Sequence, residues 1–271
     1  MDILSIIKER RSVRTFDGRA LLPEDKAKIE NYINSGKNPY MINVGWSILD
    51  AKENRLASPV IVGAETYITG KVSPVPHAEE AFGWAFESMV IFAWSIGVGT
   101  TWIAGTMDRA AFEKASALAR GETMPCVSPL GYAAKKMSFR EMMMRKGVKA
   151  DSRYPFESLF FKDGFGTPLF YEEAGDIKDA LEAVRRAPSA VNKQPWRAVI
   201  TDGAVHFYEK KSGGYVSASG WDLQKVDMGI ALAHFDMVTK EAGIGTEFLI
   251  RDPGIRMPEG TEYIASFILA G

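Results

Sequence analysis

The chain has 271 residues, of which 46% are hydrophobic and 25% are charged, a balance that is typical of folded globular proteins and not of disordered chains. Its 33 Lys and Arg residues nearly offset its 34 Asp and Glu residues, so the formal net charge is -1. Because the overall charge is close to zero, it favours neither a nucleic acid nor an anionic membrane as a partner, and any phosphate group must be bound by a local cluster of basic residues.

The cysteine content and the apolar stretches indicate a cytoplasmic location. Cys126 is the single cysteine, so the chain can form no intramolecular disulfide, which fits a cytoplasmic protein, although a single cysteine is also compatible with export. The opening sequence, MDILSIIKERRSVRTF, mixes charged and apolar residues in a way that signal peptides do not. The longest apolar stretch, from Met89 to Trp94, is soon interrupted by Ser95 and Gly97 and is too short to span a bilayer. We therefore expect a cytoplasmic protein with no membrane segment.

Hydrophobic periodicity and turn residues predict a mixture of helices and short strands in the first part of the chain. In chain order we expect a short amphipathic helix over 3–11, a helix over 24–33 that begins after Pro23, strands over 41–49 and 59–62, a buried helix over 79–96, a helix over 108–120 and a strand over 126–132. The following segment, 135–149, is rich in basic residues and methionines. Its pattern is compatible with a lid, a crossover or a surface helix.

The second part of the chain repeats this kind of alternation. We expect a connector over 165–171, a helix over 177–186, a turn over 187–195, strands over 196–201 and 205–209, a long helix over 223–242 and a closing strand over 263–269. Together with the first part, this pattern predicts an α+β fold with a mostly antiparallel sheet in each half.

The two parts also share short sequences. Gly-Val-Gly-Thr-Thr-Trp-Ile (97–103) aligns with Gly-Ile-Gly-Thr-Glu-Phe-Leu (243–249), each after a long predicted helix, and Lys37-Asn38-Pro39-Tyr40 aligns with Lys193-Gln194-Pro195-Trp196. A chance recurrence of Gly-X-Gly-Thr is the alternative. We interpret the similarity as an internal duplication, with related halves over 1–162 and 163–271 that pair as an intramolecular pseudo-dimer.

The densest basic cluster of the chain is Arg10, Arg11, Ser12 and Arg14, at the end of the first predicted helix. Guanidinium groups bind phosphate oxygens in bidentate fashion, and a serine hydroxyl can add a further hydrogen bond. Basic residues at a helix C-terminus can also simply interact with the helix dipole. We name these four residues the arginine clamp and regard them as a candidate phosphate site.

A second candidate element is the turn Ala187-Pro188-Ser189-Ala190-Val191-Asn192-Lys193-Gln194-Pro195-Trp196. Its prolines fix the backbone, its small residues allow a close approach, and its amide side chains can bind the edge of a planar heterocycle. The alternative is a rigid helix-to-strand connection with Trp196 packed in the core. By contrast, the three histidines are far apart in sequence, so we expect no metal site.

Taken together, these motifs resemble the nitroreductase family of FMN enzymes. Arg-Arg-Ser-Val-Arg-Thr-Phe (10–16) resembles the opening of that family, and Pro-Ser-Ala-Val-Asn-Lys-Gln-Pro-Trp (188–196) resembles its second flavin motif. Trp102-Ile103-Ala104-Gly105 and Leu130-Gly131-Tyr132 resemble two further signatures, and Ser152-Arg153-Tyr154-Pro155 resembles its late basic position. The motifs occur in order from one end of the chain to the other.

The resemblance implies roles for particular residues, most of which contact FMN. The expected phosphate and ribityl contacts are Arg10, Ser12, Arg14 and Arg153, flanked by Arg11; the expected flavin wall is Pro188, Ser189, Ala190 and Asn192; and the backbone facing flavin N5 is Ala104 and Gly105. Contacts to the pyrimidine edge should come from 50–55, where Lys52, Asn54 and Arg55 are candidates. The flavin carries the redox chemistry, so no general acid or base is assigned.

One departure from the family pattern is informative. In ordinary family members the Pro-Ser-Asn motif follows soon after the N-terminal arginines, whereas here that position holds only Asn34-Ser35-Gly36-Lys37-Asn38-Pro39-Tyr40 and the intact motif occurs in the second half. The second half in turn lacks the arginine clamp. The resemblance therefore implies a fused, two-half variant in which each half keeps a different share of a single flavin site.

The function implied is that of an FMN-dependent oxidoreductase that takes hydride from NADH or NADPH and reduces a small electron-poor acceptor such as a nitroaromatic or a quinone. A flavin-binding protein without turnover and a structural relative that has lost flavin are the alternatives. We expect a monomer or a weak homo-oligomer, with no nucleic-acid or membrane partner.

Overall fold

The computed structural model describes residues 2–217 and 220–270. The chain divides into two compact units, and their boundary falls between Ala150 and Asp151. The first unit is Glu9–Ala150, and the second combines Met1–Lys8 with Asp151–Gly271. The N-terminal segment up to Lys8 is thus grouped with the C-terminal part of the chain, whereas the motifs suggested halves of 1–162 and 163–271.

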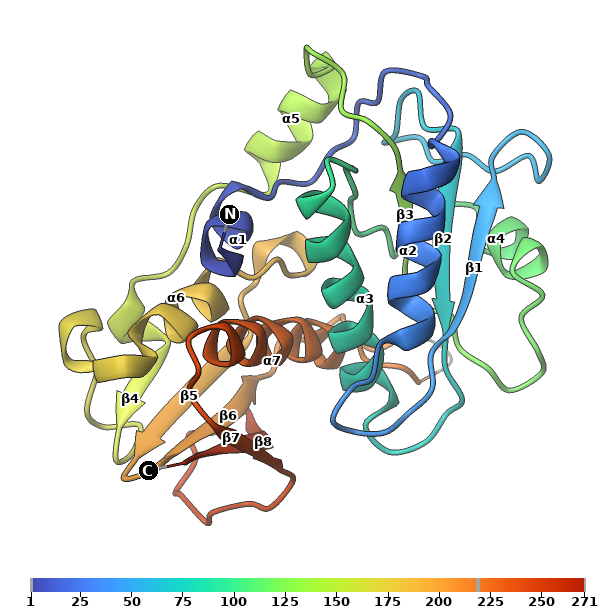
Figure 1. Cartoon of the computed structure of the whole chain (residues 1–271). Helices are drawn as coiled ribbons and strands as arrows, with labels where there is room; N and C mark the ends of the chain where they lie inside the picture. The colour runs from blue at the N-terminus through green and yellow to red at the C-terminus, as the bar shows by residue number, and fades with distance from the viewer. Residues whose placement is uncertain (1, 218–219, 271) are drawn as a thin grey trace. The chain divides into compact units, whose positions relative to one another are not determined.

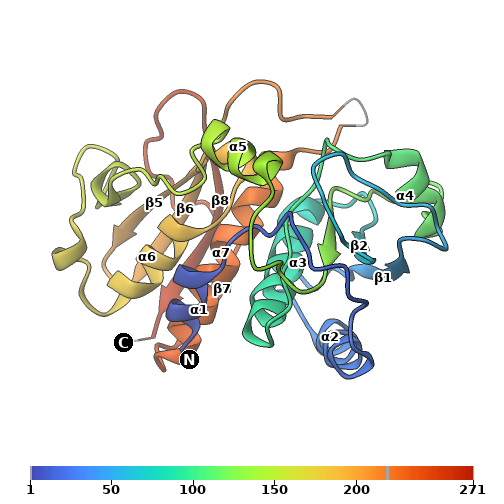
Figure 2. The same ribbon diagram turned by 90° about the horizontal axis from the view of Figure 1, so that it is seen from above.

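The first unit contains a three-stranded antiparallel sheet with helices on both faces (Figures 1 and 2). Its elements are α2 (Pro23–Ser35), β1 (Gly45–Asp50), β2 (Thr66–Lys71), α3 (Ala78–Ser95), α4 (Arg109–Ala115), β3 (Val127–Leu130) and α5 (Phe139–Gly147), and the sheet order is β1-β2-β3.

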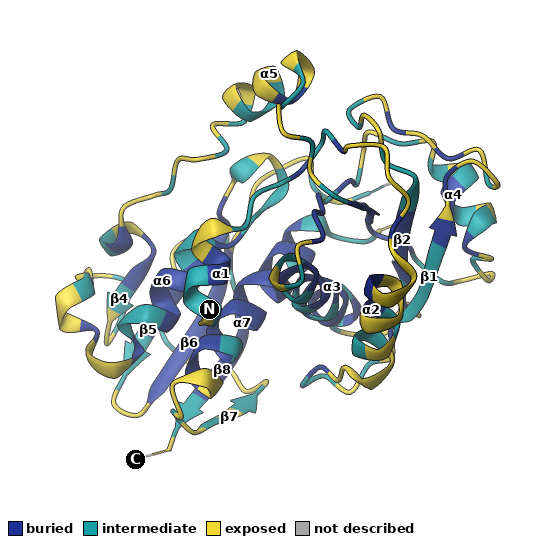
Figure 3. Ribbon diagram, turned by 45° about the horizontal axis from the view of Figure 1, so that its top comes forward, coloured by how far each residue is buried: buried dark blue, intermediate teal, exposed yellow. Residues whose placement is uncertain are grey.

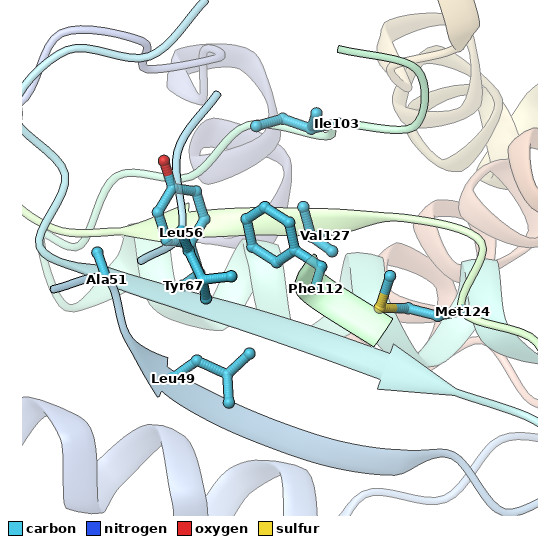
Figure 4. Packing of buried hydrophobic residues seen from close by; sticks show 8 residues of the cluster. All are labelled: Leu49, Ala51, Leu56, Tyr67, Ile103, Phe112, Met124 and Val127. Carbon is cyan, nitrogen blue, oxygen red and sulfur yellow. The ribbon is translucent and has the colours of Figure 1, made fainter. Parts of the chain in front are cut away.

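Side-chain alternation along β2 explains why both faces of this sheet are covered. Tyr67 points to the α4 face, where its ring lies 5.1 Å from that of Phe112 in an edge-on contact. The small core on this face also includes Leu49, Met124 and Val127 (Figure 4). Gly70 points to the opposite face, where an added Cβ would lie 2.8 Å from the Phe82 ring. A glycine is therefore required for α3 to pack this closely against β2.

The second unit contains a five-stranded sheet in the order β4-β5-β6-β8-β7. The only parallel pair among its described strands is β4 with β5; the other pairs are antiparallel. Its elements are α1 (Ile3–Glu9), β4 (Phe160–Lys162), α6 (Lys178–Arg186), β5 (Trp196–Thr201), β6 (Ala204–Lys210), α7 (Leu223–Glu241), β7 (Thr246–Leu249) and β8 (Thr261–Leu269), with 3-10 turns at Phe156–Ser158, Tyr171–Glu173, Gly175–Ile177 and Ala190–Asn192.

An aromatic cluster fixes α7 to the sheet of the second unit. The ring of Phe235 on α7 lies 5.4 Å from that of Phe207 on β6 and 4.9 Å from that of Phe267 on β8. All three side chains are fully buried, so their burial contributes on the order of 2 kcal/mol each through the hydrophobic effect. In Figure 3, α7 is buried along most of its length, whereas α5 of the first unit is largely exposed.

The structure confirms the predicted α+β fold with mostly antiparallel sheets, and it corrects several elements. The expected strand over 59–62 is wrong, because there only Val62 forms an isolated bridge, to Thr15. The strands β2, β4 and β7 were not predicted. The helix expected over 108–120 ends at Ala115, because Ala117 adopts a left-handed conformation with φ +50° that a helix cannot continue through. The 135–149 segment contains the surface helix α5. No helix in the described ranges is long and apolar enough to cross a membrane.

Candidate flavin-binding residues

The backbone of the arginine clamp is held as an extended segment in the first unit. Ser12 pairs with Thr100 in a parallel bridge, and the Val13 N–H donates to the Thr100 carbonyl at 2.8 Å. The side chain of Val13 is fully buried against Gly99, where an added Cβ would lie 2.8 Å from a Val13 methyl group. The predicted helix over 3–11 accordingly ends at Glu9, since the next residues pair with neighbouring segments.

Arg10 has a buried guanidinium group with unsatisfied donors. Its side chain is 5% exposed, and its Nε lies 3.8 Å from Oε1 of Glu87 in helix α3. Within the described part of the chain, neither Nε nor Nη1 has a hydrogen-bond partner. Buried donors are normally satisfied, so the free edge of this guanidinium is suited to an anionic ligand.

Arg11 and Arg14 both depend on a second buried carboxylate, Glu141 of helix α5. Oε1 of Glu141 accepts from Nη1 of Arg11 at 3.1 Å, and Oε2 accepts from the backbone N–H of Arg14 at 3.2 Å. Burial lowers the pKa of the Arg14 guanidinium, and neighbouring Arg145 lowers it further, whereas Glu141 raises it. A partly desolvated cation of this kind gains from a bound anion.

The Trp102–Gly105 segment follows helix α3 in the chain and contacts Glu87, the carboxylate that Arg10 also approaches. Nε1 of Trp102 donates to Oε2 of Glu87 at 2.8 Å, and the ring of Trp102 lies 4.6 Å from that of Phe86. The carbonyl of Ala104 accepts from Nη2 of Arg109 at 2.9 Å. The N–H groups of Ala104 and Gly105 donate no hydrogen bond to any described residue, which leaves two backbone donors available.

The three candidates for the pyrimidine edge of a flavin lie in a turn after β1. Nζ of Lys52 forms an ion pair with Glu65 at 2.8 Å, and Nδ2 of Asn54 donates to the carbonyl of Asp50. Arg55 adopts a left-handed backbone conformation with φ +53°. Nothing in these contacts singles out one of the three, and they stay candidates.

The turn over 187–196, in the second unit, has a constrained backbone. Val191, Asn192 and Gln194 have φ values of +43°, +59° and +51°, a region that non-glycine residues seldom occupy. Such strain persists only where surrounding contacts impose it. Here Oγ of Ser189 accepts from the Gln194 N–H at 2.8 Å, and the Ala190 N–H donates to both carboxylate oxygens of Asp227 at 3.1 Å.

Two of the predicted residues, Arg153 and Asn192, meet within the second unit. Nη1 of Arg153 donates to Oδ1 of Asn192 at 3.4 Å, and Nδ2 of Asn192 donates to the carbonyl of Ser152 at 3.0 Å. Nη2 of Arg153 donates to the carbonyl of Arg186 at the end of α6. The late basic position and the turn over 187–196 therefore form one cluster, although they are separated in sequence.

Sequence reasoning missed the three buried carboxylates that hold these motifs, namely Glu87, Glu141 and Asp227. Glu87 did leave a signal, because it is the one charged residue between Ala81 and Ser95 in an otherwise apolar helix. Carboxylates are seldom fully buried without a specific partner. No group of three or more His, Cys, Asp or Glu residues suited to a metal ion occurs in the described ranges.

Comparison with known proteins places the fold in a known class. A protein from Thermotoga maritima described as a "putative nitroreductase" is 23% identical, with a TM-score of 0.63 over 99% of this chain and 94% of that one. A nitroreductase family protein from Clostridium novyi matches 50% of this chain at 16% identity with a TM-score of 0.43, and an FMN-dependent nitroreductase from Clostridium difficile matches 52% at 16% identity with a TM-score of 0.42. No protein with a curated description matches. The first similarity shows a nitroreductase-like α+β fold.

The sequence profile of the family described as "Putative TM nitroreductase" matches residues 2–239. The chain therefore belongs to this nitroreductase family.

Proposed function

We propose that the protein is an FMN-dependent oxidoreductase that accepts hydride from NADH or NADPH and reduces a small electron-poor compound such as a nitroaromatic or a quinone. Family membership supports the reaction class, and one structurally similar protein is described as FMN-dependent. The observation that carries the proposal is the buried guanidinium of Arg10, whose Nε and Nη1 lack hydrogen-bond partners among the described residues and which is close in sequence to Arg11, Ser12 and Arg14.

The clamp fits the phosphate of FMN better than a diphosphate-linked dinucleotide such as FAD. A terminal phosphomonoester carries up to two negative charges and three acceptor oxygens, and several arginines with a serine hydroxyl supply donors for all of them. When bound, FMN would supply the redox chemistry through its ring.

The residues of this chain would bind and orient that ring. In the first unit, the available N–H groups of Ala104 and Gly105 would donate toward the reactive edge of the ring. In the second unit, the rigid backbone of Pro188, Ser189, Ala190 and Asn192 would supply a wall, and Arg153 would add a positive charge beside Asn192. These roles follow from the family motifs.

The first test is the absorption spectrum of the purified protein after incubation with FMN. A yellow protein whose flavin absorbance bleaches on anaerobic addition of NADH or NADPH supports the proposal. Flavin that binds but stays oxidised would instead indicate a flavin-binding protein without turnover, and a protein that cannot be reconstituted would contradict flavin binding altogether.

A second test addresses the clamp. Replacing Arg10 and Arg14 together by Ala should weaken FMN binding at least ~tenfold, because each charged hydrogen bond contributes ~1.5–3 kcal/mol. The matched control is Arg19→Ala, which removes an exposed arginine that pairs with Asp17 and should leave affinity unchanged. Fluorescence-quenching titrations measure both; equal affinities for all variants would refute the assignment of the phosphate site.

A further inference from the structure

Glu87 contacts two of the flavin motifs of the first unit through one carboxylate. Its Oε2 accepts from Nε1 of Trp102 at 2.8 Å, and its Oε1 lies 3.8 Å from Nε of Arg10. The side chain is 0% exposed in the middle of the apolar helix α3. Burying a carboxylate is costly unless it is paired and hydrogen-bonded, so packing alone does not explain an acid at this position.

We propose that Glu87 is a positioning residue for FMN, which fixes the Arg10 guanidinium and the Trp102–Gly105 segment in one arrangement. This inference rests on the proposed function. Because Glu87 approaches the Nε side of Arg10, the Nη1 group, which has no partner among the described residues, stays available for the phosphate. The same carboxylate anchors Trp102, and with it the backbone of Ala104 and Gly105 two and three residues further along the chain.

The choice of a carboxylate follows from the chemistry of its two neighbours. Both the indole N–H of Trp102 and the guanidinium of Arg10 are donors, and neither can accept a hydrogen bond. An ionised glutamate presents an acceptor oxygen to each of them. Glutamine has one acceptor and one donor, so in either orientation its NH2 group faces a donor, and one of the two neighbours loses its partner.

This argument predicts a particular pattern in FMN affinity. Glu87→Gln should weaken FMN binding ~tenfold, the effect expected for loss of one charge-assisted contact. In a Trp102→Phe background the indole donor is absent, so the glutamine oxygen is free to face Arg10. There the same Glu87→Gln change should weaken binding only about threefold or less, a non-additivity that neighbours sharing one group show.

A readout that needs no flavin tests the contact itself. In the ¹H–¹⁵N spectrum of the apoprotein, the indole signal missing from the Trp102→Phe variant identifies Trp102. This signal should shift in Glu87→Gln, because the hydrogen bond to a charged oxygen is lost or weakened. Glu80→Gln is the matched control: Glu80 is a buried acid on the same helix that pairs with His77, and its replacement should change neither the Trp102 signal nor FMN affinity.

The outcomes separate this inference from the proposed function. If the wild-type protein binds FMN and Glu87→Gln binds it equally tightly, with only a lower melting temperature, Glu87 is a stability residue and the inference is wrong. Equal penalties in both Trp102 backgrounds would also overturn it. If the wild type binds no FMN, the proposed function fails instead, whatever the indole signal shows. Should Glu87→Gln fail to fold alone, Glu87→Leu in the Trp102→Phe background removes every acceptor that faces Arg10 and should weaken FMN binding ~tenfold relative to Trp102→Phe, and unchanged affinity there would overturn the inference.

Discussion

Glu209, in strand β6 of the second unit, is a buried acid that should make the stability of the protein depend on pH. Its side chain is fully buried, and neither carboxylate oxygen has a hydrogen-bond partner within the described part of the chain. Burial, together with the nearby carboxylates of Asp222 and Glu262, raises the pKa of Glu209 to about 7, and Lys211 and Lys225 oppose this rise. The carboxyl group is therefore largely protonated in the folded protein at mildly acidic pH.

This raised pKa makes stability depend on pH. The ordinary pKa of 4.5 applies to the unfolded chain, so between about pH 4.5 and 7 the unfolded state loses a proton that the folded state keeps. The contribution of Glu209 to the free energy of unfolding is therefore fully present below pH 4.5 and is lost as pH rises through 7, by at most about 1.4 kcal/mol for each unit of pKa shift.

Glu209→Gln should remove this dependence, because glutamine imitates the protonated acid. We expect urea unfolding to give the variant and the wild type similar stability near pH 5 and the variant higher stability above pH 7. Burial also raises the pKa of Asp227 and Asp236, and the charge of Glu209 adds to the rise at Asp227, so the difference between the two curves reports Glu209 together with its effect on Asp227. Parallel curves from pH 5 to 8 would show that Glu209 ionises normally.

Among the elements, helix α5 combines a buried anchor with an exposed apolar surface. Phe139, Met142 and Met143 are 74%, 50% and 53% exposed, whereas Glu141 is 1% exposed and contacts both Arg11 and the backbone of Arg14. Ser138 caps the helix by accepting from the Glu141 N–H, and its own N–H donates to Oγ1 of Thr15. The helix is therefore connected to the arginine clamp mainly through polar contacts.

We predict that Glu141→Ala releases α5 while the rest of the first unit stays folded. Glu141→Ala removes the acceptor of two hydrogen bonds, at a cost on the order of 1–3 kcal/mol because the Arg11 side chain that it leaves is 29% exposed, and α5 has little apolar burial to compensate. Hydrogen exchange measured by mass spectrometry should show faster exchange over 139–147 and around Arg14. Met143→Ala, on the exposed side of the same helix, is the control and should exchange as the wild type does. Unchanged protection in Glu141→Ala would mean that other contacts hold the helix.

The elements that could be predicted from sequence are those whose hydrophobic pattern and terminal residues are clear within the element itself. Helix α3 was predicted from its long apolar run and α7 from its length, and the glycine that follows each of them, Gly97 and Gly243, indeed has φ of +83° and +72°. Strand β2 was missed because it contains Gly70, whose role depends on the Phe82 ring of α3, a contact far away in sequence. Strands β4 and β7 are only 3 and 4 residues long, too short for an alternation to be recognised.

The candidate site shows the same division. The arginine clamp and the turn over 187–196 could be identified because their residues are contiguous in the chain. The carboxylates that contact them were harder to recognise: Glu87 stands out only as the one charge between Ala81 and Ser95 of an apolar helix, and Glu141 lies in a basic helix where an acid is not unusual. A buried charge is recognised only once its partner is known to be near, which the fold alone determines.

At the scale of the whole molecule, the two units hold different flavin motifs. The arginine clamp and Trp102–Gly105 lie in the first unit, and Arg153 and the turn over 187–196 lie in the second. Each unit also has one long helix followed by a Gly-X-Gly sequence. The internal duplication that would explain this likeness stays a prediction, as does a monomer or weak homo-oligomer.

From this motif content we predict one FMN per chain. A duplicated chain with two working sites would need a second clamp and a second Pro-Ser-Asn turn, but positions 34–40 hold only the degraded turn and no Arg-Arg-Ser-X-Arg sequence occurs after Arg14. Titration of the apoprotein with FMN, followed by flavin fluorescence and by the mass of the native complex, should therefore reach saturation near one equivalent.

If that single binding event uses both sets of motifs, Arg14→Ala and Asn192→Ala should each weaken FMN binding. Asn192→Ala should cost ~1–3 kcal/mol, because it leaves a polar group unpaired. The double variant should depart from additivity by ~0.5 kcal/mol or more. Lys193→Ala in the same turn is the control for a general disturbance of the backbone. Saturation near two equivalents would contradict the prediction, and so would an Asn192→Ala protein that melts earlier but binds FMN as tightly as the wild type.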